Sequence, residues 1–254
     1  MKKGFTLVEL SIVLVIVGLL IGGILVGQSL IESAKINRVI KEFAQYEIAA
    51  KQFKVKYKYL PGDHPQGYLF NSQCTQPLEC RGDGDGKIYR QVYDGVRNYL
   101  EVRNVWYHLQ GTGMLKINLP FTNVAVQTQT TWLTGDNFPK SAYGNNTMLI
   151  LSTISAGNGI SSIATASVLE HMGMQISNTG TDGSFYQGNI KPLNALALDQ
   201  KIDDGVWGTG ALLSHNTGGN VAGTLNCVTG ASYNVSYDSD VNGCRVILVL
   251  DSLN

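Results

Sequence analysis

The chain has 254 residues, of which 44% are hydrophobic, and its 19 lysines and arginines balance its 19 aspartates and glutamates. A formal net charge of zero gives the whole molecule no attraction for a polyanion, which argues against general nucleic-acid binding. About 190 residues follow the first sixty, enough for one globular domain with a hydrophobic core.

The N-terminal segment combines a basic start, one carboxylate and a long apolar run. Lys2 and Lys3 come first, and Glu9 is the only charged residue from Gly4 through the apolar run of residues 10–26. With its flanks this run approaches the ~20 residues that span a bilayer, and the two lysines would keep the N-terminus cytoplasmic. A carboxylate in hydrocarbon costs roughly 2.5–3.5 kcal/mol, so we expect Glu9 to have a positively charged partner.

Three interpretations of residues 1–30 compete. A secretory signal peptide has a similar basic start, but its apolar core is shorter, and no A-x-A-like cleavage site follows here. A plain single-pass anchor explains the length and the lysines and leaves Glu9 and the Gly4-Phe5 junction without a reason. The third interpretation accounts for all of these features.

The sequence Gly4-Phe5-Thr6-Leu7-Val8-Glu9 resembles the type III signal of type IV pilins and type II secretion pseudopilins. The resemblance implies that a prepilin peptidase cuts after Gly4, which removes residues 1–4 as a leader, and that the new N-terminal Phe5 is N-methylated. It also implies that Glu9 pairs with the terminal amine of an adjacent subunit. Cleavage frees an ammonium at Phe5, and such a charge would offset the desolvation of a buried carboxylate.

The same resemblance implies a role and a location. The role is that of a structural subunit, a minor pilin or pseudopilin, and not of an enzyme; an adhesin or DNA-uptake receptor at a filament tip is the alternative. The location is the bacterial inner membrane, with the head in the periplasm, and later a filament in the periplasm or outside the cell. The implied partners are other pilin-like subunits, the prepilin peptidase and methyltransferase, and an inner-membrane assembly platform.

The apolar run continues into an amphipathic pattern. Apolar residues recur at steps of three and four from Ile36 to Leu60, which indicates one face of a helix. Pro61-Gly62 then supplies a stop. We therefore predict one helix of roughly 80 Å from Phe5 to about Tyr59. The predicted fold is α+β: a helical spine over residues 5–60 carries a loop-rich globular head with a β-sheet over residues 61–254.

Periodicity predicts two further helices in the head. Apolar residues from Ile88 to Leu109 step by three or four, and Gly111 follows them. A shorter helix is predicted over Leu193–Ile202, ending near Gly205.

Strands are predicted where short apolar runs occur. Leu149–Leu151 and Arg245–Leu250 are typical of buried strands. The polar segment Asp238–Gly243 would turn a hairpin between Tyr233–Tyr237 and that last strand.

Four cysteines fall into two local pairs. Cys74 and Cys80 enclose five residues, and Cys227 and Cys244 enclose sixteen. Three pairings are possible, and we favour the two local ones for an exported head. A zinc site is the rival, but neither pair has C-x-x-C spacing. The second pair also resembles the C-terminal disulfide loop of many pilins.

An acidic, glycine-rich segment follows the first cysteine pair. Asp83 and Asp85 alternate with glycines, and such carboxylates suit calcium. Arg81 and Val92 stand where an EF-hand would have Asp and Glu, so the segment is either a calcium loop of another kind or a glycine-rich turn. Resemblance to secretion pseudopilins, which hold a structural calcium in the head, supports calcium; no cofactor is otherwise required. A second acidic group consists of Asp199, Asp203 and Asp204. We interpret it as a helix end and turn, and a cation site is the alternative.

Overall fold

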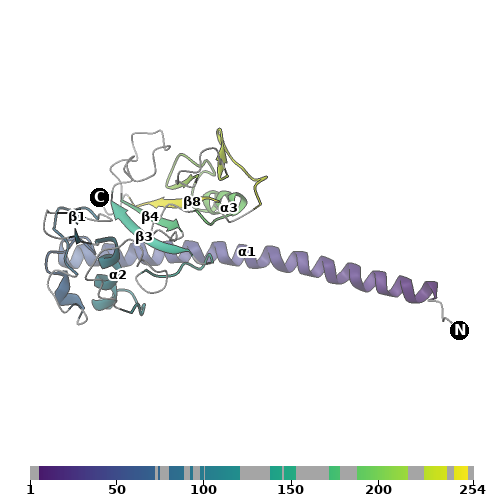
Figure 1. The fold of residues 1–254 in the computed structure, drawn as a ribbon, viewed down its shortest axis with the longest axis horizontal. Helices are drawn as coiled ribbons and strands as arrows, with labels where there is room; N and C mark the ends of the chain where they lie inside the picture. The colour runs from purple at the N-terminus through teal and green to yellow at the C-terminus, as the bar shows by residue number, and fades with distance from the viewer. Residues whose placement is uncertain are drawn as a thin grey trace.

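A computed structural model of the chain describes residues 6–71, 74, 80–88, 92–93, 98–99, 101–120, 138–144, 146–152, 172–177, 188–216, 226–238 and 243–250. The long helix α1 (Leu7–Tyr57) runs the length of the molecule and carries a head at its C-terminal half (Figure 1). The other elements are η1 (Gly67–Phe70), β1 (Val92–Tyr93), β2 (Asn98–Tyr99), α2 (Glu101–Gly111), β3 (Thr147–Ser152), β4 (Met172–Ser177), α3 (Pro192–Ile202), β5 (Leu212–His215), β6 (Val228–Thr229), β7 (Ser232–Tyr233) and β8 (Arg245–Val249). This layout confirms the predicted α+β class.

The long helix is continuous and has two different halves. Thr6 caps its N-terminus, and Lys58, in the left-handed conformation with φ 66°, ends it by donating its N–H to the Lys54 carbonyl at 2.9 Å. One face of the C-terminal half is buried against the head, through Ile36, Val39, Phe43, Tyr46, Ala49, Ala50 and Phe53. The predicted helix is therefore confirmed over 51 residues, whereas the predicted start at Phe5 lies outside the described residues.

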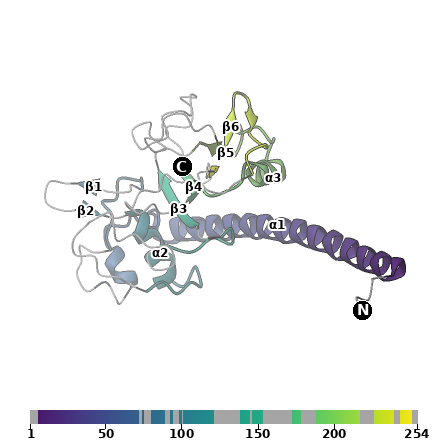
Figure 2. The same ribbon diagram turned by 45° about the vertical axis from the view of Figure 1, so that its right-hand side comes forward.

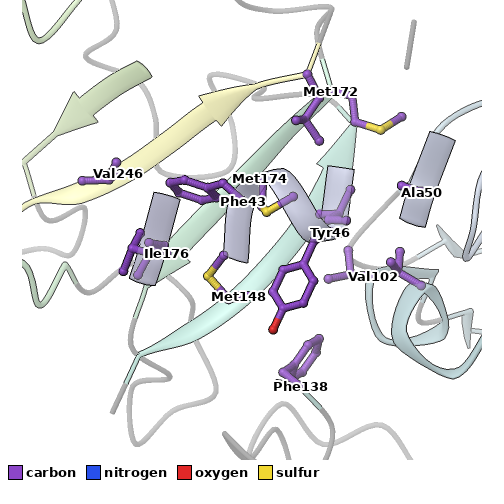
Figure 3. Close-up of a cluster of buried hydrophobic side chains, with 14 of the residues drawn as sticks. Phe43, Tyr46, Ala50, Val102, Phe138, Met148, Met172, Met174, Ile176 and Val246 are labelled. Carbon is purple, nitrogen blue, oxygen red and sulfur yellow. The ribbon is translucent and has the colours of Figure 1, made fainter. Parts of the chain in front are cut away.

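The central sheet has four antiparallel strands in the order β3-β4-β8-β5. It packs on α1, and Figure 3 shows Phe43 and Tyr46 of the helix among Met148, Met174 and Ile176 of the sheet. Because these side chains are nearly inaccessible to water, the hydrophobic effect holds the helix and the sheet together as one core. The strands predicted around 149–151 and 245–250 are confirmed as β3 and β8.

The helix predicted over Ile88–Leu109 is wrong in its first part. Val92–Tyr93 and Asn98–Tyr99 pair as the short antiparallel strands β1 and β2, and the helix α2 begins only at Glu101. The residues between the two strands include Asp94-Gly95, a pair that favours a hairpin turn. Apolar spacing alone could not reveal this break. The helix predicted over Leu193–Ile202 is confirmed as α3.

The hairpin predicted between Tyr233–Tyr237 and the last strand is also wrong. Tyr233 belongs to β7, which pairs with β6 across a turn at Gly230, whose φ is 61°. Strand β8 instead lies between β4 and β5, so both of its edges are occupied. Burial of Val246 inside the sheet explains why the last strand takes the central position and not a peripheral one.

Both predicted disulfides are present. Cys74 and Cys80 are joined at an S–S distance of 1.95 Å, and Cys227 and Cys244 at 2.04 Å. The second bond attaches the residue before β6 to the residue before β8. No free cysteine remains in the chain.

Candidate assembly segment and acidic clusters

The N-terminal half of α1 presents an apolar surface to its surroundings. Large apolar side chains from Leu7 to Ile31 are exposed, with Leu7 at 88% and Leu19 at 73%. Figure 1 shows this half extending away from the head. Its length and composition suffice to cross a membrane, and an apolar surface of this extent needs a lipid or protein partner.

Thr6 and Glu9 form a reciprocal cap at the start of this surface. The Glu9 carboxylate accepts the Thr6 N–H and the Thr6 hydroxyl, both at 2.8 Å. The Thr6 hydroxyl oxygen accepts the Glu9 N–H at 3.2 Å. These bonds place the carboxylate at the helix N-terminus, where the peptide dipoles favour negative charge. Gly4 and Phe5, the predicted processing residues, lie outside the described residues.

Sequence reasoning identified Glu9 and missed Thr6 as its partner. The signal was present, because a threonine three residues before a glutamate and ahead of an apolar run is a capping-box pattern. Among the described residues, none forms an ion pair with Glu9.

The head attaches to α1 through polar contacts as well as through the core. Glu32 accepts the Asn194 side-chain N–H at 3.0 Å, and Asn37 accepts the Lys201 ammonium at 2.8 Å. The Glu42 carboxylate accepts the Ala142 N–H at 2.9 and 3.0 Å. Burial raises the pKa of Glu42, and the Ala142 bond opposes that rise. Contact with the head thus begins at Glu32, directly after the exposed apolar surface.

The first acidic cluster brings Asp83 and Asp85 together with Asp63, and one carboxylate oxygen from each lies within 4.8 Å of the others. Asp63 is fully buried and accepts the N–H groups of Gly84 at 2.7 Å and Gly86 at 2.9 Å. Burial raises the pKa of Asp63 to about 7, and the charges of Asp85 and Asp83 act in the same direction. Three oxygen donors suit a hard cation, while the bonds to Asp63 also fit a turn without one, so calcium remains a prediction.

The role of Asp63 in that cluster was not visible in the sequence. It precedes Asp83 by twenty residues, and only the folded chain brings the turn after α1 against the acidic loop. Gly82 permits this approach, because a Cβ there would lie 2.2 Å from the Asp63 Cα.

The second acidic cluster closes the turn after α3. Asp199 is buried and accepts the Tyr233 hydroxyl at 2.6 Å. Asp203 accepts backbone N–H groups at the start of β5, and Asp204 accepts the Thr209 hydroxyl at 2.7 Å. One oxygen from each of these carboxylates also lies within 4.8 Å of the others, as in the first cluster. Because each carboxylate has partners in the protein, the arrangement fits a helix end and turn without a cation, and this interpretation stays a prediction.

Comparison with known proteins gives one family match. The model of the prokaryotic N-terminal methylation motif matches residues 1–25. The comparisons with curated proteins and with solved structures gave no match. The motif implies processing by a prepilin peptidase and assembly with other pilin subunits, and the apolar α1 fits membrane anchoring. The motif and the long apolar helix that contains most of it make the N-terminal segment of this chain similar to that of type IV pilins and pseudopilins, and support a place in that family.

Proposed function

We propose that the protein is a structural subunit, a minor pilin or pseudopilin, of a type IV pilus-like or type II secretion filament. The observation that carries this proposal is the exposed apolar half of α1, with the Thr6–Glu9 cap at its tip. Each large apolar side chain left in water instead of buried costs about 1.5–3 kcal/mol. Such a helix is stable in a bilayer, and outside the bilayer it needs the helices of neighbouring subunits.

In this proposal the precursor waits in the inner membrane with its head in the periplasm. The peptidase cuts after Gly4, and the amine of Phe5 is methylated. An inner-membrane assembly platform then moves the helix into the filament. There the carboxylate of Glu9 meets the terminal amine of an adjacent subunit, which supplies a cation to offset its desolvation. The pairing fixes the axial position of one helix against the next.

The test compares Glu9→Ala with Ser11→Ala, a change at a second polar residue whose hydroxyl donates to the Val8 carbonyl at 2.9 Å. We expect both variants to be cleaved and retained in the membrane, and only Glu9→Ala to be absent from isolated filaments. Mass spectrometry should find the mature chain starting at a methylated Phe5, and Gly4→Ala should leave the precursor uncut. Normal incorporation of Glu9→Ala, or a purified chain that still starts at Met1, would contradict the proposal.

The alternative is that the subunit stands at a filament tip as an adhesin or a DNA-uptake receptor. The size of the head favours it, because about 190 residues follow the first sixty. Filaments with and without this subunit should then differ in their binding to cells or to DNA. Equal binding would contradict this alternative and leave only the structural role.

A further inference from the structure

The head begins where the exposed apolar surface of α1 ends. Ile31 is 59% exposed, and the next residue, Glu32, accepts the Asn194 side-chain N–H at 3.0 Å. Asn194 also donates to the Tyr143 hydroxyl at 2.6 Å. The junction is therefore fixed by a hydrogen-bond network that is partly buried, and no length of free helix separates the apolar surface from the head.

Bilayer dimensions place this junction close to the lipid. A hydrocarbon layer of ~30 Å accommodates about twenty helical residues, which corresponds to Leu7–Val26. The six steps from Val26 to Glu32 rise roughly 9 Å, whereas each headgroup layer is ~5–7 Å thick. Contact between Glu32 and Asn194 then lies at the outer boundary of the headgroups.

One edge of the head faces that boundary. In both ribbon views α3 is the part of the head nearest the N-terminal half of α1, and the yellow-green segment with β6 and β7 lies beside it (Figures 1 and 2). Lys191, before α3, and Asp238 of that segment are joined at 2.9 Å. Leu193 of α3 is 59% exposed, and Val235 of the segment with β6 and β7 is 51% exposed. Apolar side chains are thus held together with charged ones.

The charge pattern of this edge suits lipid headgroups better than a polyanion. Lys191 is paired with Asp238 at 2.9 Å, and Lys35 with Glu32 at 3.0 Å. Charges that cancel locally give little attraction for a polyanion. Lysines around apolar side chains can instead extend toward the headgroups while the apolar groups enter the interfacial layer.

Further contacts prevent the head from tilting away from this position. Lys201 of α3 donates to the Asn37 side-chain oxygen at 2.8 Å, and the Glu42 carboxylate accepts the Ala142 N–H at 2.9 Å. Val39 and Phe43 of α1 are buried in the core beside these contacts. The angle between the head and the membrane-crossing helix is therefore set by the fold.

We propose that the edge formed by Lys191, Leu193 and Val235, hereafter the lipid-facing edge, rests on the headgroups of the bilayer that α1 crosses. The inference depends on the proposed function only for the membrane anchoring of α1. Because apolar contact contributes most of the interaction between this edge and lipid, we expect the interaction to form on zwitterionic lipid and to strengthen little on anionic lipid. Extraction of the subunit into a filament has to break it.

The test uses the full chain in lipid vesicles. Because the chain has no free cysteine, a single added cysteine accepts a fluorescent label. Leu193→Cys and Val235→Cys probe the lipid-facing edge. Leu69→Cys is the matched control: Leu69 is 66% exposed, and η1, which contains it, packs on α2 at the other end of the head. Nitroxide groups on lipid headgroups quench nearby labels.

We expect quenching at residues 193 and 235 to exceed that at residue 69 severalfold, at every ratio of protein to lipid. Equal quenching at the three positions would overturn the proposal. A quenching difference that disappears as the protein is diluted in lipid would also overturn the proposal, and would assign the edge to contact with a second copy of the chain. Flotation of the vesicles tests the membrane anchoring of α1 separately from the lipid-facing edge. A chain that floats without the quenching difference is anchored by α1, and only the proposal about the lipid-facing edge then fails. A chain that does not float would overturn the anchor and the edge together.

Discussion

His108 connects Gly62 to Cys80 inside the head. Its Nδ1 accepts the Gly62 N–H at 2.9 Å, and its Nε2 donates to the Cys80 carbonyl at 2.6 Å. These bonds require a neutral ring with the proton on Nε2. The ring is fully buried and stacks on Phe53 of α1 with 5.7 Å between the ring centroids. One side chain thus joins the long helix, the turn that follows it and the first disulfide loop.

The first prediction concerns acid stability. Burial lowers the pKa of His108 to about 4, against about 6.5 in an unfolded chain. Protonation below pH 6.5 therefore favours the unfolded state. The stability that the neutral ring contributes is complete above pH 6.5 and is lost as pH falls toward 4, by roughly 2–3 kcal/mol.

Thermal unfolding between pH 7.5 and 4.5 checks this prediction by comparing the wild type with His108→Gln. We expect the variant to be less stable at neutral pH and the difference to shrink as the pH falls. The pKa of His215 is also lowered and that of Asp63 is raised, so both groups affect the pH dependence of stability. Because wild type and variant share these two groups, the comparison isolates His108. A difference that stays constant with pH would show that His108 does not titrate in this range.

The second prediction concerns the close approach of Gly67 to the same histidine. A Cβ at Gly67 would lie 2.0 Å from His108 Nε2 and 2.4 Å from the Cys80 carbonyl oxygen. Gly67→Ala should therefore displace the ring and lower the free energy of unfolding by about 1–3 kcal/mol. Gly208→Ala is the control, since no atom lies within 4 Å of its added Cβ. Equal urea midpoints for the two variants would contradict this account.

Features set by local sequence were predictable, and features set by pairing across the chain were not. The long helix follows from an uninterrupted apolar pattern, and the two disulfides follow from short loops. Strand β8 was predictable as a strand, but its neighbours β4 and β5 begin far away in sequence. Asp63 joins the acidic loop for the same reason: the contact is made by the fold and leaves no local pattern.

The third prediction concerns calcium at the first acidic cluster. If Asp63, Asp83 and Asp85 bind calcium, the ion stabilises only the folded head, by about 2.7 kcal/mol at a hundred times its dissociation constant. The melting temperature should then rise in calcium relative to a chelator. Asp83→Asn with Asp85→Asn should abolish this rise, whereas Asp204→Asn, in the second cluster, should keep it. Identical melting in calcium and in chelator would leave the segment as a glycine-rich turn.

The fourth prediction concerns Thr6 as the partner of Glu9 inside the membrane. Thr6→Ala removes the hydroxyl that donates to the Glu9 carboxylate at 2.8 Å, while Thr6→Ser retains one. A hydrogen bond to a charged group contributes about 1.5–3 kcal/mol, and in hydrocarbon the carboxylate has no water to replace it. We expect less Thr6→Ala than wild type or Thr6→Ser to insert into vesicles, measured by flotation at equal protein. Equal insertion of all three would mean that the Thr6 backbone N–H alone suffices to hold the carboxylate until a neighbouring amine arrives.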